Sequence, residues 1–166
     1  MEIETAHDDV VFRDHRPGDM GWVVQRHGEL YHDLCGWDAT FEALVAEIAA
    51  RFLRGFDPAF ERSWIVEIGG RRAGCCFLTR RDDETAQLRM LLVEPWARGR
   101  GLGRRLVAEC VAQARRVGYR KMVLYTSKGL DSARRLYEAE GFRLVEETPR
   151  HQWGQDHVEQ WWELGL

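Results

Sequence analysis

Apolar positions along the chain follow two periods, and each period predicts one kind of element. Short blocks in which apolar residues alternate or stand together predict strands, over 10–15, 63–68, 73–78, 85–93, 121–126, 142–146 and 157–164. Apolar residues three and four positions apart predict helices, over 20–34, from Asp38 or Thr40 to Gly55, over 102–116 and over 131–140. The predicted order is strand, two helices, three strands, helix, strand, helix and two strands.

Short polar residues and glycines mark the ends of these elements. Asp19 is expected to cap the helix 20–34, and Gly36 stands where that helix should end. Gly69-Gly70 predicts a tight hairpin, because a type I′ turn needs positive φ at both central residues. The segment 85–126 reads strand, helix, strand, which demands a parallel crossover. The sequence thus predicts a mixed sheet with helices on its faces.

Length and composition are ordinary for one folded domain, expected to cover residues 1–166. The chain is 45% hydrophobic and 31% charged, and its formal charge of −3 argues against a nucleic-acid partner, since such proteins are usually basic. No apolar run reaches membrane-spanning length, and the polar start Met1 to Glu4 is not typical of a signal peptide, so no membrane partner is expected. The four cysteines lack the spacing of a disulfide framework, which favours the reducing cytoplasm.

A loop rich in glycine and arginine joins the strand 85–93 to the helix 102–116. Glycines that precede a helix leave backbone N–H groups unpaired, and the helix dipole and arginine side chains add positive charge there. We therefore expect an anion site for a phosphate-bearing ligand, the alternative being a tight turn with solvated arginines. The loop reads Arg98-Gly99-Arg100-Gly101-Leu102-Gly103-Arg104.

Two common phosphate-binding motifs do not fit this loop. A Walker loop needs GxxxxGK followed by Ser or Thr, and the chain has none. A dinucleotide fingerprint needs a third glycine where Arg104 stands, and it needs an acidic residue about 20 residues further on, where none is in place.

The register Arg98-x-x-Gly101-x-Gly103 resembles the pyrophosphate loop of the GNAT superfamily of N-acetyltransferases. A second motif, Ala133-x-x-x-Tyr137 followed by Gly141-Phe142, is similar to the family's later motif and stands in the right order. The resemblance implies an α/β (α+β) fold. In this fold, a mixed, mostly antiparallel twisted sheet of six to seven strands is flanked by about four helices, and the sheet is splayed between strands 4 and 5. It also implies acetyl-CoA as cosubstrate and no metal.

A narrower resemblance extends outside these motifs. The stretches 26–31, 36–38 and 151–156 are similar to the acetyltransferase half of regulators that join a MarR-type DNA-binding domain to a GNAT domain. This resemblance would make the chain a free-standing relative of those regulators.

The GNAT resemblance assigns cofactor contacts. Backbone N–H groups and arginines of the loop would bind the pyrophosphate, and strand backbone would pair with the pantetheine amides. The family often has Asn at the position of Leu130, and Ser132 is the candidate substitute for its polar contact. The other residues concerned are Leu92, Val93, Arg98, Gly99, Arg100, Gly101, Leu102, Gly103 and Arg104.

Tyr137 is expected to protonate the departing CoA thiolate, because the family places this tyrosine beside the sulfur and a phenol is acidic enough to donate. The alternative is a tyrosine that only packs in the core. Glu94 is the first candidate for removing a proton from the incoming amine, with Glu29 and His27 as others. The alternative for Glu94 is a solvated turn residue.

His27 and Tyr31 share a helix face and, with Trp37, are expected to form one wall of an acceptor pocket that also includes Glu29. The alternative is an amphipathic helix whose polar residues face water. His27 and His32 have poor metal spacing, and no metal is expected. In Trp161-Trp162, one ring should face outward, where it could mark a homodimer contact.

These observations predict an acetyl-CoA-dependent N-acetyltransferase. It would transfer acetyl directly to a primary amine of a small molecule, with amino acids and related metabolites among the candidate acceptors. No cysteine lies in either motif, so a covalent enzyme intermediate lacks a nucleophile. The alternative is an acetyl-CoA-binding sensor, or a partner module of a regulator, with little catalysis.

Overall fold

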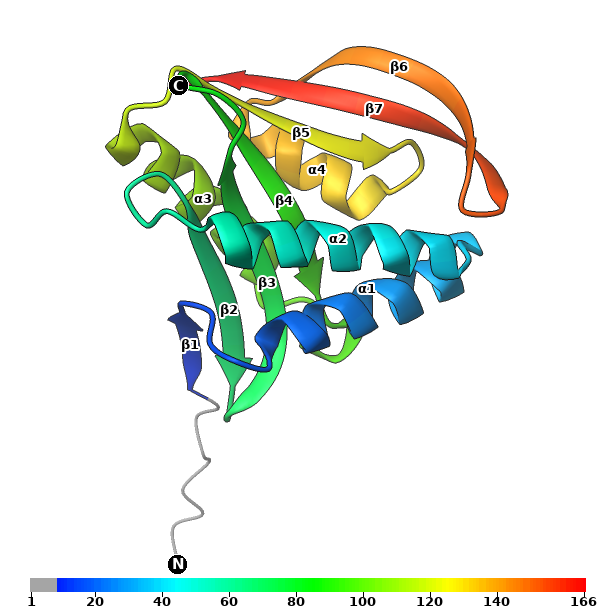
Figure 1. Cartoon of the computed structure of the whole chain (residues 1–166), viewed down its shortest axis with the longest axis horizontal. Helices are drawn as coiled ribbons and strands as arrows, with labels where there is room; N and C mark the ends of the chain where they lie inside the picture. Colours follow the sequence, from blue (N-terminus) through cyan, green and yellow to red (C-terminus); the bar gives the residue numbers. More distant parts are fainter. Residues whose placement is uncertain (1–8) are drawn as a thin grey trace, which may run out of the picture.

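A computed structural model describes residues 9–166, so the polar start at residues 1–4 lies outside the described part. Seven strands form one sheet in the order β1-β2-β3-β4-β5-β7-β6 (Figure 1). All neighbouring pairs are antiparallel except β4 and β5, which are parallel. The strands are β1 Val10–Arg13, β2 Arg62–Ile68, β3 Arg71–Arg80, β4 Thr85–Val93, β5 Lys121–Ser127, β6 Arg143–Gln152 and β7 Gln155–Gly165. The helices are α1 Asp19–Cys35, α2 Ala39–Gly55, α3 Leu102–Val117 and α4 Asp131–Glu140, with a short 3-10 turn, η1, at Pro95–Ala97.

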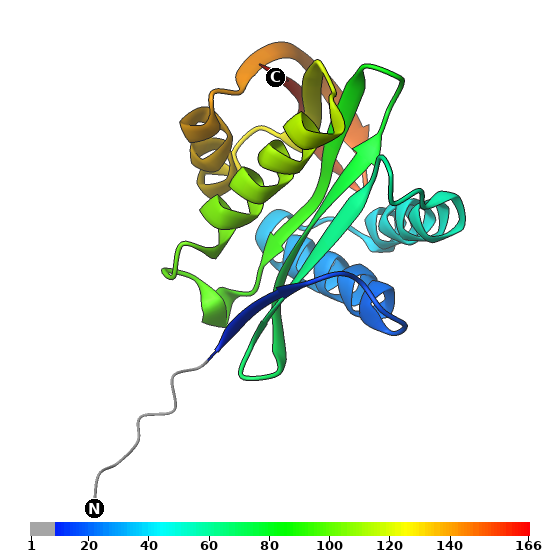
Figure 2. The same cartoon turned by 90° about the vertical axis from the view of Figure 1, so that its left-hand side faces the viewer.

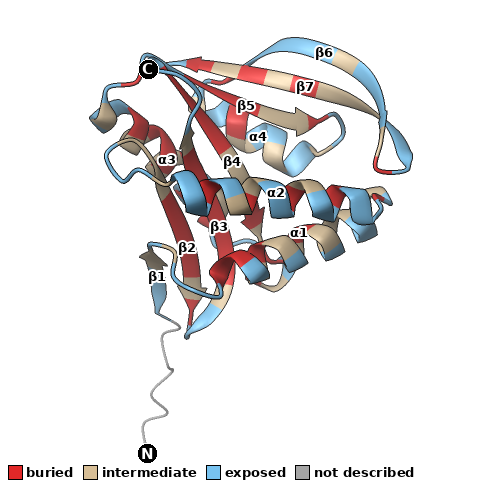
Figure 3. Cartoon of the chain, in the orientation of Figure 1, coloured by how far each residue is buried: buried red, intermediate tan, exposed pale blue. Residues whose placement is uncertain are grey.

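Helices cover both faces of the sheet (Figure 2). The helices α1 and α2 lie on one face, and α3 and α4 lie on the other. Each layer has its own buried cluster: Val23, Val45 and Phe77 belong to the first, and Leu106 and Met122 to the second. The central strands β2 and β3 are therefore buried on both sides, whereas β6 at the sheet edge is largely exposed (Figure 3).

Most predicted elements are confirmed, and so is the mixed, mostly antiparallel sheet with four helices. Gly69 and Gly70 have φ of 57° and 79°, as a type I′ hairpin requires. The last hairpin is longer than predicted, because β6 runs on to Gln152 and turns at Trp153-Gly154, whose φ values are 57° and 77°. An exposed edge strand carries little apolar alternation, so its length left no trace in the sequence pattern.

Asp19 does not cap α1, contrary to the prediction. Gly18 is the N-cap residue, and the Asp19 side chain is fully buried in the first turn. Its Oδ2 accepts a 2.7 Å hydrogen bond from Nη1 of Arg13, and its Oδ1 accepts a 2.9 Å bond from Nε of Arg72. Burial alone would raise the pKa of Asp19, but the hydrogen bonds from Arg13, the Arg16 amide and Arg72 outweigh burial and lower it to about 2. These contacts tie the start of α1 to the sheet.

The parallel pairing of β4 with β5 stops halfway along both strands. It joins Thr85–Leu88 to Lys121–Leu124 and goes no further. Beyond it Met90 has a φ of 56°, and the pairing of β3 with β4 shifts register between Cys75 and Phe77, which is the mark of a bulge. The end of β4, from Leu91 to Val93, is therefore paired with β3 on one side and open on the side that faces β5.

The buried carboxylate of Asp19 gives a stability prediction. We expect Asp19→Asn to lower the free energy of unfolding by about 3–5 kcal/mol, because Arg13 and Arg72 lose the charge that compensates them. The matched change Asp14→Asn removes an exposed carboxylate that, within residues 9–166, pairs with Arg62 alone, at 3.3 Å, and should cost less than about 1 kcal/mol. Urea unfolding of both variants measures the difference, and equal losses would contradict the role given to Asp19.

Candidate functional site

Two cavities meet where β4 and β5 separate. The first, which we call the aromatic cavity, has a volume of about 340 Å³ and lies between the sheet, α1, α2 and the β6–β7 turn. The second, which we call the β4 cleft, has a volume of about 600 Å³ and lies between the open end of β4, α1 and the start of α4. Tyr31, Leu91, Leu130 and Ala133 line both cavities. A ligand in the cleft can therefore reach the aromatic cavity.

The glycine loop leads from the β4 cleft to the start of α3. Gly99 and Gly101 have φ of 79° and 74°, and a Cβ added to either would meet no atom within 4 Å. The Arg105 amide donates to the Gly101 carbonyl at 3.1 Å, which leaves the amides of Leu102, Gly103 and Arg104 without an intrahelical acceptor. These groups form the positive end of the helix dipole.

Arginine side chains surround this loop. Arg98 lines the β4 cleft, and Arg98, Arg100 and Arg104 are exposed and form no ion pair within residues 9–166. Arg105 differs from them, because its guanidinium lies 3.9 Å from the centre of the Phe12 ring. The unpaired arginines and free amides together can hold a diphosphate-like anion.

Gly103 has a packing role as well. A Cβ at this position would lie 2.8 Å from Cδ1 of Leu136, so α3 and α4 approach each other closely here. Leu136, Leu92 and Val93 line the β4 cleft, and Ser132 lies on its α4 wall beside Leu130. The structure thus brings the expected cofactor-binding residues of the loop, the strand and α4 to one cleft and its mouth.

Tyr137 projects from α4 to the aromatic cavity. It is 5% exposed, and its ring packs edge-on against Phe142 with centroids 6.0 Å apart. Its hydroxyl makes no hydrogen bond to the part of the chain that the structure describes. Burial raises the pKa of Tyr137 well above its usual value of 10, and the neighbouring Tyr31 adds to the shift. The phenol therefore holds its proton at neutral pH.

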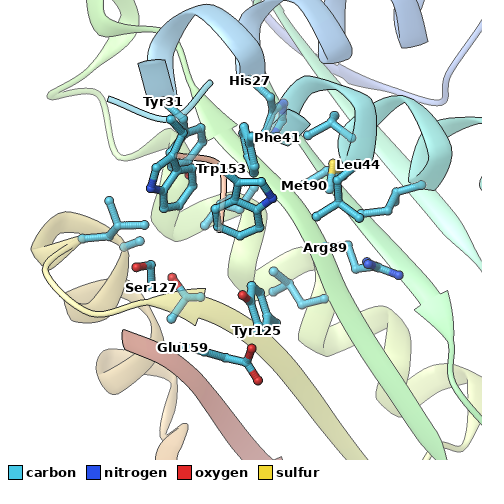
Figure 4. A pocket seen from close by; sticks show the side chains of 18 of the residues that line it. His27, Tyr31, Phe41, Leu44, Arg89, Met90, Tyr125, Ser127, Trp153 and Glu159 are labelled. Carbon is cyan, nitrogen blue, oxygen red and sulfur yellow. The ribbon is translucent and has the colours of Figure 1, made fainter. Parts of the chain in front are cut away.

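Three of the residues expected in an acceptor wall, His27, Tyr31 and Trp37, line the aromatic cavity together. The rings of His27, Tyr31 and Trp37 stack in sequence, with centroids 5.9 Å and 5.2 Å apart. Trp153 of the β6–β7 turn packs against Trp37 at 4.5 Å, and Figure 4 shows His27, Tyr31 and Trp153 around the cavity. The Asp38 amide donates to the Trp153 carbonyl at 2.9 Å, so the turn is fixed over the cavity. The face of α1 that carries His27 and Tyr31 therefore looks into a cavity rather than into bulk water.

His27 is neutral in this environment. Its Nδ1 lies 2.8 Å from the Val23 carbonyl, so Nδ1 carries the proton and Nε2 is left as the acceptor. Burial lowers the pKa of His27 from 6.5 to about 4, and the bond to Val23 offsets only part of that effect.

Glu94 and Glu29 do not line either cavity. Both oxygens of Glu94 are held by Arg26, with Nε to Oε1 at 2.5 Å and Nη2 to Oε2 at 2.9 Å, and its side chain is 5% exposed. Glu94 is thus neither an open carboxylate at the cavity nor a solvated turn residue. Glu29 is exposed and binds Arg26 and Gln25. The Arg26–Glu94 pair joins α1 to the end of β4, which a sequence pattern could not reveal because 68 positions separate the two residues.

Several residues of the cavity escaped the sequence analysis. Gln87 lines it from β4. Arg89 of β4, Tyr125 of β5 and Glu159 of β7 also line it (Figure 4). Polar residues two apart within the strand 85–93 were an available signal, since they must share one face of the sheet. Trp161, expected to mark a dimer contact, also lines the cavity and has the Arg81 guanidinium 4.7 Å from its ring centre, so it gives no support for a homodimer.

Metal-binding clusters and membrane-spanning helices are both absent from the described residues. Among residues 9–166, no group of three or more His, Cys, Asp or Glu side chains is placed to hold a metal ion. Within the same range, no helix is both long and apolar enough to cross a membrane.

The low pKa of His27 gives a pH prediction. The unfolded chain binds a proton near pH 6.5 and the folded chain only near pH 4, so the stability gained from neutral His27 is complete above pH 6.5 and is lost as the pH falls towards 4. We expect His27→Asn to remove this slope, worth up to about 3 kcal/mol over that window. His151→Asn, at an exposed position on β6, should keep the slope. Urea unfolding from pH 7 to 4 measures it, and an unchanged slope in His27→Asn would refute the assignment.

Known proteins resemble this chain in sequence and fold. N-acetylaspartate synthetase from Danio rerio is 30% identical over 112 residues, which are 67% of this chain and 39% of that protein. The uncharacterised N-acetyltransferase YjgM from Escherichia coli K12 is 31% identical over 86 residues, which are 50% of this chain and 52% of that protein. The chain thus spans about half the length, or less, of these curated relatives.

Solved structures match nearly the whole chain. A GNAT family acetyltransferase from Elizabethkingia anophelis with acetyl-CoA bound has a TM-score of 0.65 at 18% identity, covering 96% of this chain and 99% of that one. Ribosomal-protein-alanine N-acetyltransferase from Brucella melitensis has a TM-score of 0.73 at 18% identity, covering 94% and 99%. The acetyltransferase (GNAT) family matches residues 23–142, and the chain belongs to that family.

Proposed function

We propose that residues 1–166 form one GNAT domain that transfers the acetyl group of acetyl-CoA directly to a primary amine of a small molecule. The junction of the two cavities at Leu91 carries this proposal. A long cleft that opens into an aromatic cavity suits a reaction in which an extended cosubstrate and a compact acceptor meet end to end. The name of the Danio rerio relative, N-acetylaspartate synthetase, supports an amino acid as the kind of acceptor.

The chain's residues fit acetyl-CoA. The open edge of β4 at Leu92 and Val93 offers backbone groups to the pantetheine amides, as an added strand would. The amides of Gly99 to Arg104 and the side chains of Arg98, Arg100 and Arg104 would hold the pyrophosphate, and Ser132 would contact the cosubstrate from α4. When bound, acetyl-CoA supplies the acetyl group as an activated thioester.

Tyr137 is proposed as the general acid. The new bond joins the acceptor nitrogen to the acetyl carbon, the carbon–sulfur bond breaks, and Tyr137 Oη gives its proton to the departing sulfur. Its raised pKa keeps the proton in place beforehand, and a sulfur released into the same water-poor cavity would also be more basic than in water.

The proton of the acceptor ammonium must be removed by a group that lines the aromatic cavity. Glu94 is engaged by Arg26, so we assign it to positioning α1 against β4 rather than to deprotonation. Of the acidic side chains within residues 9–166, Glu159 lines the cavity, with one oxygen 3.2 Å from Nε of Arg150 and the other 3.1 Å from Nε1 of Trp161. Each oxygen keeps a lone pair, and we propose Glu159 as the group that takes the ammonium proton, directly or through water.

Removing the Tyr137 hydroxyl tests the acid. We expect Tyr137→Phe to lower kcat by about 100-fold with near-normal affinity for acetyl-CoA, because only proton donation is lost. Tyr119→Phe is the matched control, since this tyrosine is also buried but donates to the Phe60 carbonyl at 2.8 Å, and its kcat should not change. Free-CoA release against an amine panel gives kcat, and an unchanged kcat in Tyr137→Phe would assign the acid role elsewhere.

Removing loop arginines tests the cosubstrate site. We expect Arg98→Ala with Arg100→Ala to weaken acetyl-CoA binding by about 100-fold or more, since each of the two charge-assisted hydrogen bonds contributes about 1.5–3 kcal/mol. Arg115→Ala with Arg116→Ala, at the exposed far end of α3, should leave the affinity unchanged. Titration calorimetry measures both, with the thermal transition as a folding check.

The titration, together with the turnover assay, distinguishes a transferase from an acetyl-CoA sensor. If the unmodified protein does not bind acetyl-CoA, the proposed function is wrong. Binding without turnover across a broad amine panel would instead favour an acetyl-CoA sensor.

A further inference from the structure

Arg89 lines the aromatic cavity without an acidic partner. It lies on β4 and is half-buried, and no carboxylate within residues 9–166 pairs with it. Burial lowers the pKa of the Arg89 guanidinium, and the positive charges of Arg51 and Arg81 lower it further. A partly desolvated cation beside two like charges is destabilised, and an anion bound in the cavity would relieve that cost.

Gln87 stands beside Arg89 on the same face of β4. The two residues are two positions apart and pair with Thr79 and Phe77 of β3 in regular register, so their side chains point to the same side of the sheet. Gln87 is 8% exposed and lines the cavity, yet its side-chain amide makes no hydrogen bond to residues 9–166. Since no buried side-chain nitrogen or oxygen within residues 9–166 lacks a partner, the unpartnered amide of Gln87 is accessible, and a ligand in the cavity that it lines can bond it.

The charges around the cavity are unevenly distributed. Arg51 on α2 and Arg81 in the β3–β4 turn both act on Arg89, and both are exposed. Within residues 9–166, Glu159 is the carboxylate that lines the cavity, and Arg150 of β6 and Trp161 of β7 already bind it. The β4 side of the cavity therefore carries unbalanced positive charge, while the opposite side offers a carboxylate.

We propose that the acceptor is an amino acid whose carboxylate is bound by the Arg89 guanidinium and the Gln87 amide, which together we call the carboxylate clamp. The inference rests on the proposed function, because it names the acceptor of that reaction. Arg89 comes directly before the bulge at Met90, so it places the carboxylate close to the point where the two cavities meet. The amine then lies between the clamp and Tyr137, and the aromatic side chains around Trp153 hold the rest of the molecule.

The size of the cavity agrees with this class of acceptor. Its volume of 340 Å³ is at the lower end of small-molecule sites, which measure about 300–1,000 Å³. The Trp153 turn is fixed by the Asp38 amide and closes one side, which favours a free amino acid over a residue within a protein chain.

Matched acceptors test the clamp. The common amino acids are compared with their decarboxylated amines, for example phenylalanine with 2-phenylethylamine and leucine with isoamylamine, by release of free CoA. The unmodified protein should prefer the carboxylated member of its best pair by about 10-fold or more in kcat/KM, as expected for a charge-assisted hydrogen bond. In Arg89→Gln that preference should fall to near unity, mainly through KM, while Arg89→Lys should keep part of it.

Control variants separate a direct contact from a general charge effect. Arg51→Gln makes the same change in charge nearby but does not line the cavity, so the preference should fall by no more than about 3-fold. Arg116→Gln, exposed on α3, should not change it. Affinity for acetyl-CoA should be the same in all four variants, which shows that they fold.

Binding of the product gives a readout that does not need turnover. For at least one of the same pairs, the unmodified protein should bind the N-acetylated amino acid more tightly than the matching N-acetylated amine, and Arg89→Gln should erase that difference. Equal kcat/KM for both members of every pair, or an Arg89→Gln variant that affects both members alike, would overturn the carboxylate clamp and leave the transferase proposal standing. If no amine is acetylated although acetyl-CoA binds, the transferase proposal is rejected. The titration with N-acetylated compounds then decides whether Arg89 and Gln87 bind a carboxylate.

Discussion

The early end of the parallel pairing between β4 and β5 is the constraint on which the rest of the site depends. Backbone groups that lose a strand partner must find another one, and within residues 9–166 no strand pairs with the end of β4, from Leu91 to Val93, on the side facing β5. A sheet edge left open inside a fold, rather than at its rim, is costly unless a ligand uses it. The bulge at Met90 turns this edge into the wall of a cleft and lets the cleft run into the aromatic cavity.

Separate contacts hold the open region in shape. The buried Arg26–Glu94 pair joins α1 to the end of β4, and the Asp38–Trp153 hydrogen bond joins the α1–α2 loop to the turn between β6 and β7. Gly103 lets α4 approach α3, which brings Tyr137 to the cavity. The proposed acid, the β4 cleft and the aromatic cavity are thus supplied by different layers of the fold, and the proposed chemistry requires all of them to keep their places.

How far the sequence predicted the molecule depended on the range of each interaction. Local signals were sufficient for the helices, for the Gly69-Gly70 turn and for the glycine loop, because capping, turn conformation and periodicity act within a few residues. Long-range pairs were out of reach: Asp19 looked like a cap until Arg72 was seen to bind it, and Glu94 looked available until Arg26 was seen to hold it. Part of the lining of the aromatic cavity was predicted, because His27, Tyr31 and Trp37 are close in the chain, whereas the residues that β4 contributes are far from them in sequence.

Hydrogen exchange of backbone amides, followed residue by residue with and without acetyl-CoA, tests the central claim most directly. The open edge of β4 and the glycine loop should bind the cosubstrate through their amides, so exchange should slow at Leu91 to Val93 and at Gly99 to Arg104 when acetyl-CoA is added. Exchange in β1 and at the exposed end of α3 should not change. Binding of acetyl-CoA with no protection along β4 and the loop would contradict the account.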